Sequence, residues 1–232
     1  MRKCFLLFLF FFATFISVCQ DAHFSQFYAN PLYLNPAFVG NSYCPKINLN
    51  FKNQWTRLDG GYSTYSMSYD KFAESLGGGV GVLITHDKSG AGNLSTTNVN
   101  LIYGYTLNIN RNLSFKGGFQ LGYFQNSIDW DNLTFADMYT PIPGITIETN
   151  ETKISAIGKG IDISAGGIFY NEFFFGGLAV HHLTEPEQYI FGYSDTKLNR
   201  KYSIHGGAKI NIDNGLGELG ISPNLLIQFQ GN

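Results

Sequence analysis

Polar and apolar residues alternate along segments of roughly ten residues, and this two-residue period recurs through most of the chain. In the clearest run, Asn98–Ile109, every second residue from Val99 onward is apolar, whereas the residues between are mostly Asn, Gly and Thr. Successive side chains of a β-strand point to opposite faces of a sheet. The pattern therefore predicts long strands that each have one apolar and one polar face.

Nine segments carry this pattern. The other two clear runs are Lys46–Thr56 and Arg200–Ile212. The weaker runs are Ser63–Phe72, Gly78–His86, Leu113–Asn126, Gly160–Tyr170, Phe173–Leu183 and Glu218–Phe229. Most of these runs are longer than the usual strand of about 5–6 residues, which favours a sheet built to cross a thick layer.

The connections between these runs alternate in length. Short turns with hairpin chemistry are Asn110–Asn112, Asn171–Glu172 and Asp213–Gly215. The longer links are Asp87–Asn93, Ser127–Lys159 and Thr184–Asn199. Tight turns at one end and long loops at the other are typical of an outer-membrane β-barrel. We expect the longest link, Ser127–Lys159, to fold over the barrel mouth or into its interior.

Composition supports a membrane environment for such strands. Only 14% of residues are charged, against roughly 25% in an average soluble domain, while 16% are aromatic and 27 are Gly. The sequence therefore predicts an all-β, antiparallel transmembrane barrel with its apolar faces toward lipid. A soluble β-sandwich, in which two apolar faces meet in a core, is the alternative.

The charge balance and the motifs exclude several classes of function. Fifteen Lys and Arg against 17 Asp and Glu leave no basic excess for nucleic-acid phosphates. The sequence contains no nucleophile elbow, no complete phosphate-binding loop and no metal-ligand spacing. The adjacent pair His181–His182 would point to opposite faces of a strand. We therefore expect a non-enzymatic protein without a cofactor, a catalytic residue or a metal site.

Residues 1–19 resemble a secretory signal sequence. Arg2 and Lys3 precede the apolar stretch Phe5–Ile16, which is shorter than the roughly 20 residues needed to span a bilayer. Small residues before the junction predict cleavage between Cys19 and Gln20. Lipid modification of Cys19 is the alternative, but Val18 is bulkier than the residue expected at that position. The predicted organisation is 1–19 signal sequence, 20–45 N-terminal segment and 46–232 barrel.

The stretch before the first strand is aromatic and is broken by two Asn-Pro steps, which keep it from forming a long helix. A segment of this kind has to bury its aromatic side chains, and the barrel interior or its periplasmic mouth is the expected place. We predict that it is either a packed plug or a partner-docking surface. Its candidate residues are His23, Phe24, Ser25, Gln26, Phe27, Tyr28, Asn30, Pro31, Asn35, Pro36 and Phe38.

The same stretch, Gln20–Gly40, closely resembles the opening of the PorP/SprF family. That family typically begins Q-D-P-H-F-S-Q-F-Y and continues N-P-L-Y-L-N-P-A-F-x-G; here Ala22 stands at the first proline. Further matching segments are Asn53–Trp55, Leu133–Asp137, His181–Pro186 and Ser222–Leu226. The resemblance runs in order along nearly the whole chain after the signal sequence.

The resemblance implies an outer-membrane protein of the type IX secretion and gliding machinery of Bacteroidetes. It implies outer-membrane lipids as surroundings, and as partners either secretion components, namely envelope lipoproteins and periplasmic ring proteins, or a large secreted adhesin. No nucleic-acid partner is expected. A passive porin or small-molecule channel and a soluble secreted β-sandwich binding protein are the two alternative functions.

The strand count raises a question about closure. Bacterial single-chain barrels use even numbers of strands, and nine is odd. We therefore expect further C-terminal strands to be missing from the sequence, so that the strand ending at Phe229 is an open edge facing Lys46–Thr56.

The signal-sequence assignment can be tested by intact-mass analysis of the exported protein. Cleavage before Gln20 should give an unmodified mature chain that begins at that residue. A mass corresponding to a diacylated Cys19 would instead place the protein among the lipoproteins.

Overall fold

The computed structural model describes residues 21–57, 60–90, 94–130, 133, 135–138, 149, 157–188, 197–213 and 218–231. The predicted signal sequence, residues 1–19, and its junction between Cys19 and Gln20 lie outside these residues. Most of the predicted long link Ser127–Lys159 lies outside them too.

Strands make up most of the described chain. They are β1 (Lys46–Gln54), β2 (Tyr62–Ala73), β3 (Gly78–Ser89), β4 (Leu94–Asn108), β5 (Ser114–Ser127), β6 (Ile157–Tyr170), β7 (Phe174–His181), β8 (Lys201–Ala208), β9 (Ile210–Asp213), β10 (Glu218–Ile221) and β11 (Asn224–Gln230). The short helices are η1 (Phe27–Ala29), α2 (Pro31–Leu34), η2 (Pro36–Phe38), η3 (Glu74–Leu76) and η5 (Ala136–Met138). Within the described residues, no helix combines the length and hydropathy that a bilayer crossing requires.

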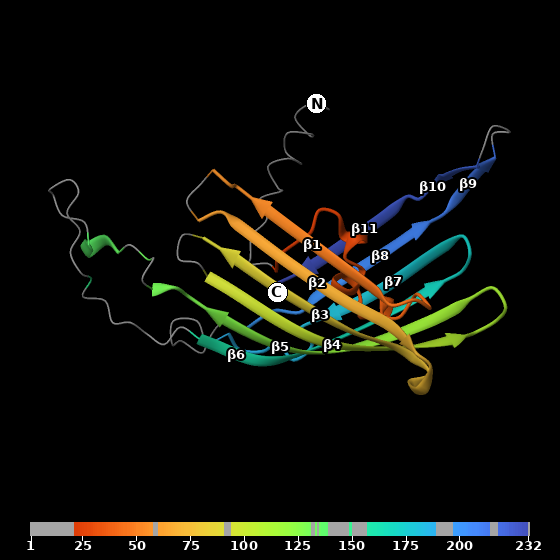
Figure 1. Ribbon diagram of the computed structural model, residues 1–232, viewed down its shortest axis with the longest axis horizontal. Coiled ribbons are helices and arrows are strands. Elements are labelled where there is room, and N and C mark those ends of the chain that lie inside the picture. The colour runs from red at the N-terminus through yellow and green to blue at the C-terminus, as the bar shows by residue number, and fades with distance from the viewer. Residues whose placement is uncertain are drawn as a thin grey trace, which may run out of the picture.

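Nine of the strands form one antiparallel sheet in the order β1-β2-β3-β4-β5-β6-β7-β8-β11. Figure 1 shows that the sheet is long and strongly curled, and that the β9–β10 hairpin projects from one end of it. The first and last strands, β1 and β11, are the two edges, and in the described residues they do not pair with each other. The fold is thus an all-β, curled antiparallel sheet, as the alternation predicts.

The nine predicted runs correspond to the nine strands of this sheet, although the last two runs are each divided. The predicted run Arg200–Ile212 is divided at Lys209, whose backbone N–H makes the last bond to the β7 side, to Phe173 O at 2.7 Å, before β9 pairs with β10 instead. The run Glu218–Phe229 is broken at Ser222–Pro223, since proline has no N–H for pairing. The prediction of two unbroken strands there was wrong.

The two faces of the sheet differ as the sequence predicts. The outward side chains are apolar and exposed: Leu101 is 58% exposed and Ile161 is 64% exposed. The inward side chains of the same sheet are largely polar and buried, and Ser68, Ser164 and Ser203 are at most 1% exposed. This arrangement is the reverse of a soluble sandwich, in which the apolar face would be covered.

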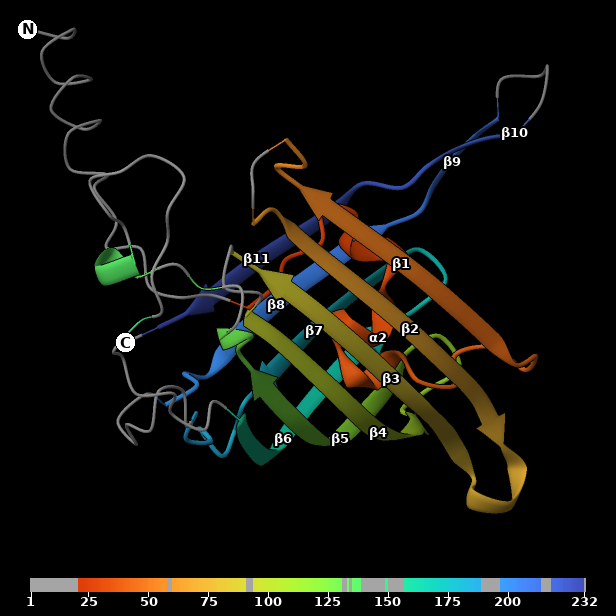
Figure 2. The same cartoon turned by 60° about the vertical axis from the view of Figure 1, so that its left-hand side comes forward.

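The inner face is covered by the N-terminal segment, which we define as Asp21–Gly40. Figure 2 shows this segment, with α2, inside the curl of the sheet. Its buried residues Leu32 and Val39 pack with Leu83 of β3 and Ile102 of β4, and these four residues form the hydrophobic core. The core therefore lies between the segment and the sheet, not between two sheets.

A charge placed on the outward face should be costly if that face contacts lipid. Leu101→Arg, in the middle of β4, should destabilise the protein by roughly 2–4 kcal/mol, the cost of an arginine near the bilayer midplane. Asn98→Arg should cost far less, because Asn98 is on the inner face of β4 and only half-buried. Unfolding of both variants in lipid vesicles would measure the difference, and equal costs would contradict the outward assignment.

Candidate functional site

The N-terminal segment contacts every strand of the nine-stranded sheet. Hydrogen bonds or ion pairs join Ala29 O to Asn50 of β1, Asn30 to Ser66 of β2, Asn35 to Gly167 O of β6, Leu34 O to His181 of β7, Asp21 to Lys201 of β8 and Asp21 N to Gln230 of β11. Val39 packs on β3 and β4, and η2 lies against β4, β5 and β6. The segment is therefore an internal core for the whole curled sheet.

A row of four glycines crosses the inner face beneath η2. Gly79 of β3 pairs in register with Gly104 of β4, Gly104 with Gly118 of β5, and Gly118 with Gly166 of β6. We call these four residues the glycine row. Because register places them side by side, they form a strip without side chains across four neighbouring strands.

The absence of side chains in the glycine row lets the segment approach the sheet backbone. A Cβ atom at Gly118 would collide with the backbone of Pro36 and Ala37, and one at Gly166 would collide with the Asn35 side chain. A Cβ at Gly104 would lie 2.7 Å from Val39 Cγ1. An added Cβ atom would thus be closer to the segment than real Cβ atoms come to their neighbours. Only glycine at these four positions lets Asn35–Gly40 pack directly on the backbone of the sheet.

Gly40 ends the seated stretch in a conformation that favours glycine, with φ of +61°. A side chain here would also collide with Gly79 Cα. Its N–H donates to the buried carboxylate of Asp70 on β2, with an N–O distance of 2.8 Å. The turn and the hydrogen bond together direct the chain out of the interior toward β1.

The two asparagines of the Asn-Pro steps anchor the segment through their side chains. Asn35 Oδ1 accepts from Ala37 N at 2.9 Å, which caps η2, while Asn35 Nδ2 donates to Leu178 O of β7 at 3.1 Å. The same amide nitrogen lies 2.9 Å from His205 Nε2 of β8. Asn30 Nδ2 donates to Ser66 Oγ at 2.8 Å. Each asparagine thus pairs polar groups that burial would otherwise leave without partners.

A charge cluster holds the other end of the segment. Asp21 Oδ2 lies 2.7 Å from Lys201 Nζ and 2.8 Å from His182 Nε2, and His182 Nδ1 lies 2.9 Å from Asp162 Oδ2. Burial alone would raise the pKa of Asp21, but Lys201 and His182 outweigh it and hold that pKa well below 3.8. Burial would lower the pKa of His182, which follows β7, but the two carboxylates raise it to about 9. His182 is therefore a cation at neutral pH.

Tyr33 connects this cluster to the helical part of the segment. Its hydroxyl donates to Ala22 O at 2.5 Å, and the Lys201 ammonium lies 4.9 Å from the centre of its ring. Burial raises the pKa of Tyr33 to about 12, so the hydroxyl stays a donor. The ring of Phe24 packs edge-on against it, with centroids 5.3 Å apart.

The candidate residues from the sequence differ in burial, and four of them are exposed. Phe24, Asn30, Asn35 and Pro36 are buried and Phe27, Pro31 and Phe38 are half-buried, whereas His23, Ser25, Gln26 and Tyr28 are exposed. Sequence reasoning missed Asp21, Ala37 and Val39, which make some of the tightest contacts. The abundance of glycine in the sequence gave no means of aligning Gly79, Gly104, Gly118 and Gly166.

The cluster does not have the geometry of a metal centre. In the described part of the chain, no group of three or more His, Cys, Asp or Glu side chains is arranged to hold a metal ion. His181, His182 and His205 instead bind Leu34 O, two carboxylates and Asn35, respectively. What this arrangement can do chemically is hold one polypeptide segment in a fixed position.

Adding one methyl group to the glycine row should loosen the segment. Gly118→Ala should cost about 1–3 kcal/mol by overpacking against Ala37. In a Cys44→Ser background, a Val39→Cys reporter, buried in the wild type, should then react with a maleimide. Gly117→Ala is the matched control, because its outward Cβ would meet only Phe115 at 3.7 Å. Equal maleimide reactivity of the Val39→Cys reporter in both variants would show that the glycine row does not hold Asn35–Gly40 against the sheet.

The attachment should weaken as the pH rises. Because the pKa of His182 is raised from 6.5 to about 9 on folding, its stabilisation is complete below pH 6.5 and is lost as pH passes through 9. The unfolding temperature of the wild type should therefore fall over this range. The fall should be smaller in His182→Asn, which keeps a residue tolerant of the φ of +58° found there. If the unfolding temperatures of wild type and His182→Asn fall in parallel as the pH rises, His182 does not contribute to the pH dependence of stability.

Comparison with known proteins agrees with the resemblance of the N-terminal stretch. No curated protein and no solved structure matches the chain. One family model, described as type IX secretion system membrane protein PorP/SprF, matches residues 16–232, which is nearly the whole chain. This family is one of secretion-system membrane proteins and not an enzyme family. The chain, with its curled sheet and seated N-terminal segment, belongs to the PorP/SprF family of type IX secretion.

Proposed function

We propose that the protein is a non-enzymatic outer-membrane barrel component whose interior is plugged by its own N-terminal segment. The observation that carries this proposal is the inversion of the sheet, with an exposed apolar outer face and a buried polar inner face. In water, that outer face would be a large unpaired apolar surface, which soluble monomers avoid. In lipid it is the surface that a spanning strand requires.

The soluble sandwich alternative needs a second layer against the apolar face. No described element covers the outward side chains of β4, and Leu101, Tyr105 and Leu107 are each at least 49% exposed. The element that the sheet does enclose, the N-terminal segment, lies on the polar face. This favours the barrel over the sandwich.

The two edges have to be paired for the sheet to lie in a bilayer. The outer groups of β1 and β11 have no strand partner among the described residues, and each unpaired backbone group in hydrocarbon costs several kcal/mol. Both edges keep the membrane alternation, with Leu49 and Phe51 outward on β1 and Ile227 and Phe229 outward on β11. We propose that further strands pair with both edges and close the wall.

A filled interior is the basis for preferring a secretion role to that of a passive porin. The N-terminal segment occupies the curl and contacts all nine strands, so little of the enclosed space is left for solute. In type IX secretion the barrel would then support cargo export or hold a large secreted adhesin for gliding. Envelope lipoproteins and periplasmic ring proteins are the proposed machinery partners, and the exposed residues Ser25, Gln26 and Tyr28 are candidates for contact with a partner or the adhesin.

Export completes the proposal. Residues 1–19 act as a signal sequence that is removed before Gln20, so that the N-terminal segment 20–45 precedes the barrel strands in the mature protein. An uncleaved hydrophobic leader would end at Cys19, two residues before Asp21, whose carboxylate is bound to the sheet.

Gene deletion with complementation tests the proposed function. Cells lacking the protein should retain secreted cargo or adhesin and leave it off the surface, with metabolism unchanged. Wild type and Gly117→Ala should restore display, whereas Gly118→Ala should restore it poorly because the segment is displaced. On fractionation of the cells, the protein should be found in the outer membrane. After purification it should conduct little in planar bilayers.

Other outcomes identify the alternatives. A large, solute-dependent conductance with normal display in the deletion strain would indicate a porin. Recovery of the protein from the culture supernatant would indicate the soluble binding protein.

A further inference from the structure

The two ends of the N-terminal segment lie at opposite ends of the sheet. Gly40 lies against Lys71 O and Gly79, beside the short β2–β3 connection. Asp21 contacts Lys201 at the start of β8, His182 just after β7, and Gln230 at the end of β11. The segment therefore runs through the interior from one end of the sheet to the other.

The connections identify the end at which Asp21 lies. The links β5–β6 and β7–β8, residues 128–156 and 182–200, are long and meet the sheet at this end. At the Gly40 end, the connections β2–β3, β4–β5 and β6–β7 are short, and the remaining one, residues 209–223 between β8 and β11, is shorter than the two long links and contains the β9–β10 hairpin. In outer-membrane barrels the long loops are extracellular and the short turns are periplasmic. On the proposed function, Asp21 is thus at the cell-surface mouth.

The groups that hold Asp21 there form a binding site made by the sheet. Lys201 and His182 both contact the same oxygen, Asp21 Oδ2, and Lys201 is 7% exposed. The elements around this site contribute Asp162 from β6, His181 from β7 and Lys201 from β8. With His182 protonated, two cations face one carboxylate of the sheet, so one positive charge is left for a ligand to neutralise.

Two donors converge on a single anionic oxygen, and in this structure that oxygen belongs to a carboxylate, which sets the class of ligand that we propose. Asp21 supplies it in this structure, and the oxygen lies at 2.7 and 2.8 Å from the two donors, as in charge-assisted hydrogen bonds. Asp21 belongs to the N-terminal segment and not to the sheet, so the sheet retains the site when the segment is altered.

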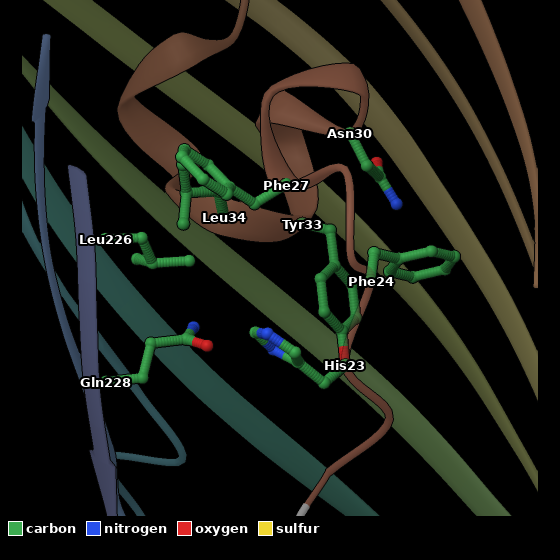
Figure 3. A pocket seen from close by; sticks show the side chains of 8 residues that line it. All are labelled: His23, Phe24, Phe27, Asn30, Tyr33, Leu34, Leu226 and Gln228. Atoms are coloured by element: carbon green, nitrogen blue, oxygen red, sulfur yellow. The ribbon is translucent and has the colours of Figure 1, made fainter. Parts of the chain in front are cut away.

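A small pocket lies between the segment and β11, and in Figure 3 the side chains of His23 and Gln228 face one another across it. The pocket is further lined by Phe27, Leu34 and Leu226. His23 is exposed, so a probe entering from the Asp21 end can reach it.

We propose that Lys201 and His182 form a carboxylate-binding site at the cell-surface mouth, that Asp21 fills it, and that the N-terminal segment is thereby displayed from inside the barrel at the outer face. The site fastens the first part of the mature chain at the surface end, while the glycine row fastens its second part. The location rests on the proposed function, but the carboxylate site does not.

The carboxylate site is tested by chemical rescue of the full chain. Asp21→Ala empties the site, and acetate should then raise its unfolding temperature above that in chloride of equal ionic strength. Wild type, whose site is filled, and Ser25→Ala, an exposed control in the same segment, should not respond to acetate. An equal response of all three proteins to acetate, or no response of Asp21→Ala, would overturn the site.

The location is tested by labelling intact cells with a membrane-impermeant maleimide. His23→Cys in a Cys44→Ser background should be labelled from outside, whereas Cys44, exposed just before β1 at the opposite end, should be labelled only after lysis.

The outcomes separate the two proposals. Labelling of Cys44 but not of His23→Cys in intact cells would place the segment the other way round and overturn the surface location, with the membrane barrel intact. Failure of His23→Cys to react in intact cells, when it reacts fully after denaturation, would overturn it too. Recovery of the protein in the soluble fraction would overturn the proposed function itself, while the acetate result would still decide the carboxylate site.

Discussion

The close approach of one backbone to another holds this structure together. Asn35–Gly40 lies so near to β3–β6 that four strands have to present glycine at the same level. Close packing of this kind gives many dispersion contacts and excludes water, and it tolerates no added methyl group without a shift. The position of η2 and the hydrophobic core around Val39 both depend on that contact.

The inner face is polar because it has a polypeptide to bind. Buried serines, asparagines and histidines would be costly against a dry interior, but the segment supplies the amide, carbonyl and carboxylate groups that pair with several of them. The outer face has no such partner and is apolar. Lipid therefore stabilises the outside of the sheet, while a single segment of the same chain specifies the inside.

Strand positions and facing could be predicted because both follow from local alternation. Leu101 outward and Asn100 inward are consequences of a period of two, and the structure agrees with both. The break at Lys209 was missed because β9 leaves β7 to pair with β10, which the alternation does not show. The break at Pro223 follows from a local residue and could have been predicted. The burial of Phe24 was anticipated from its aromatic character, but Tyr28 is 62% exposed, and nothing local distinguishes the two.

The sequence by itself determined the fold class, the two-faced strands and the family, since periodicity and the motif Gln20–Gly40 are local properties. Only the tertiary structure decided that Gly79, Gly104, Gly118 and Gly166 form one row, because their alignment depends on the register of three strand pairs. It likewise decided that Asp21 meets Lys201, 180 residues along the chain. Register and curl bring such residues together, and neither is written in any single stretch of sequence.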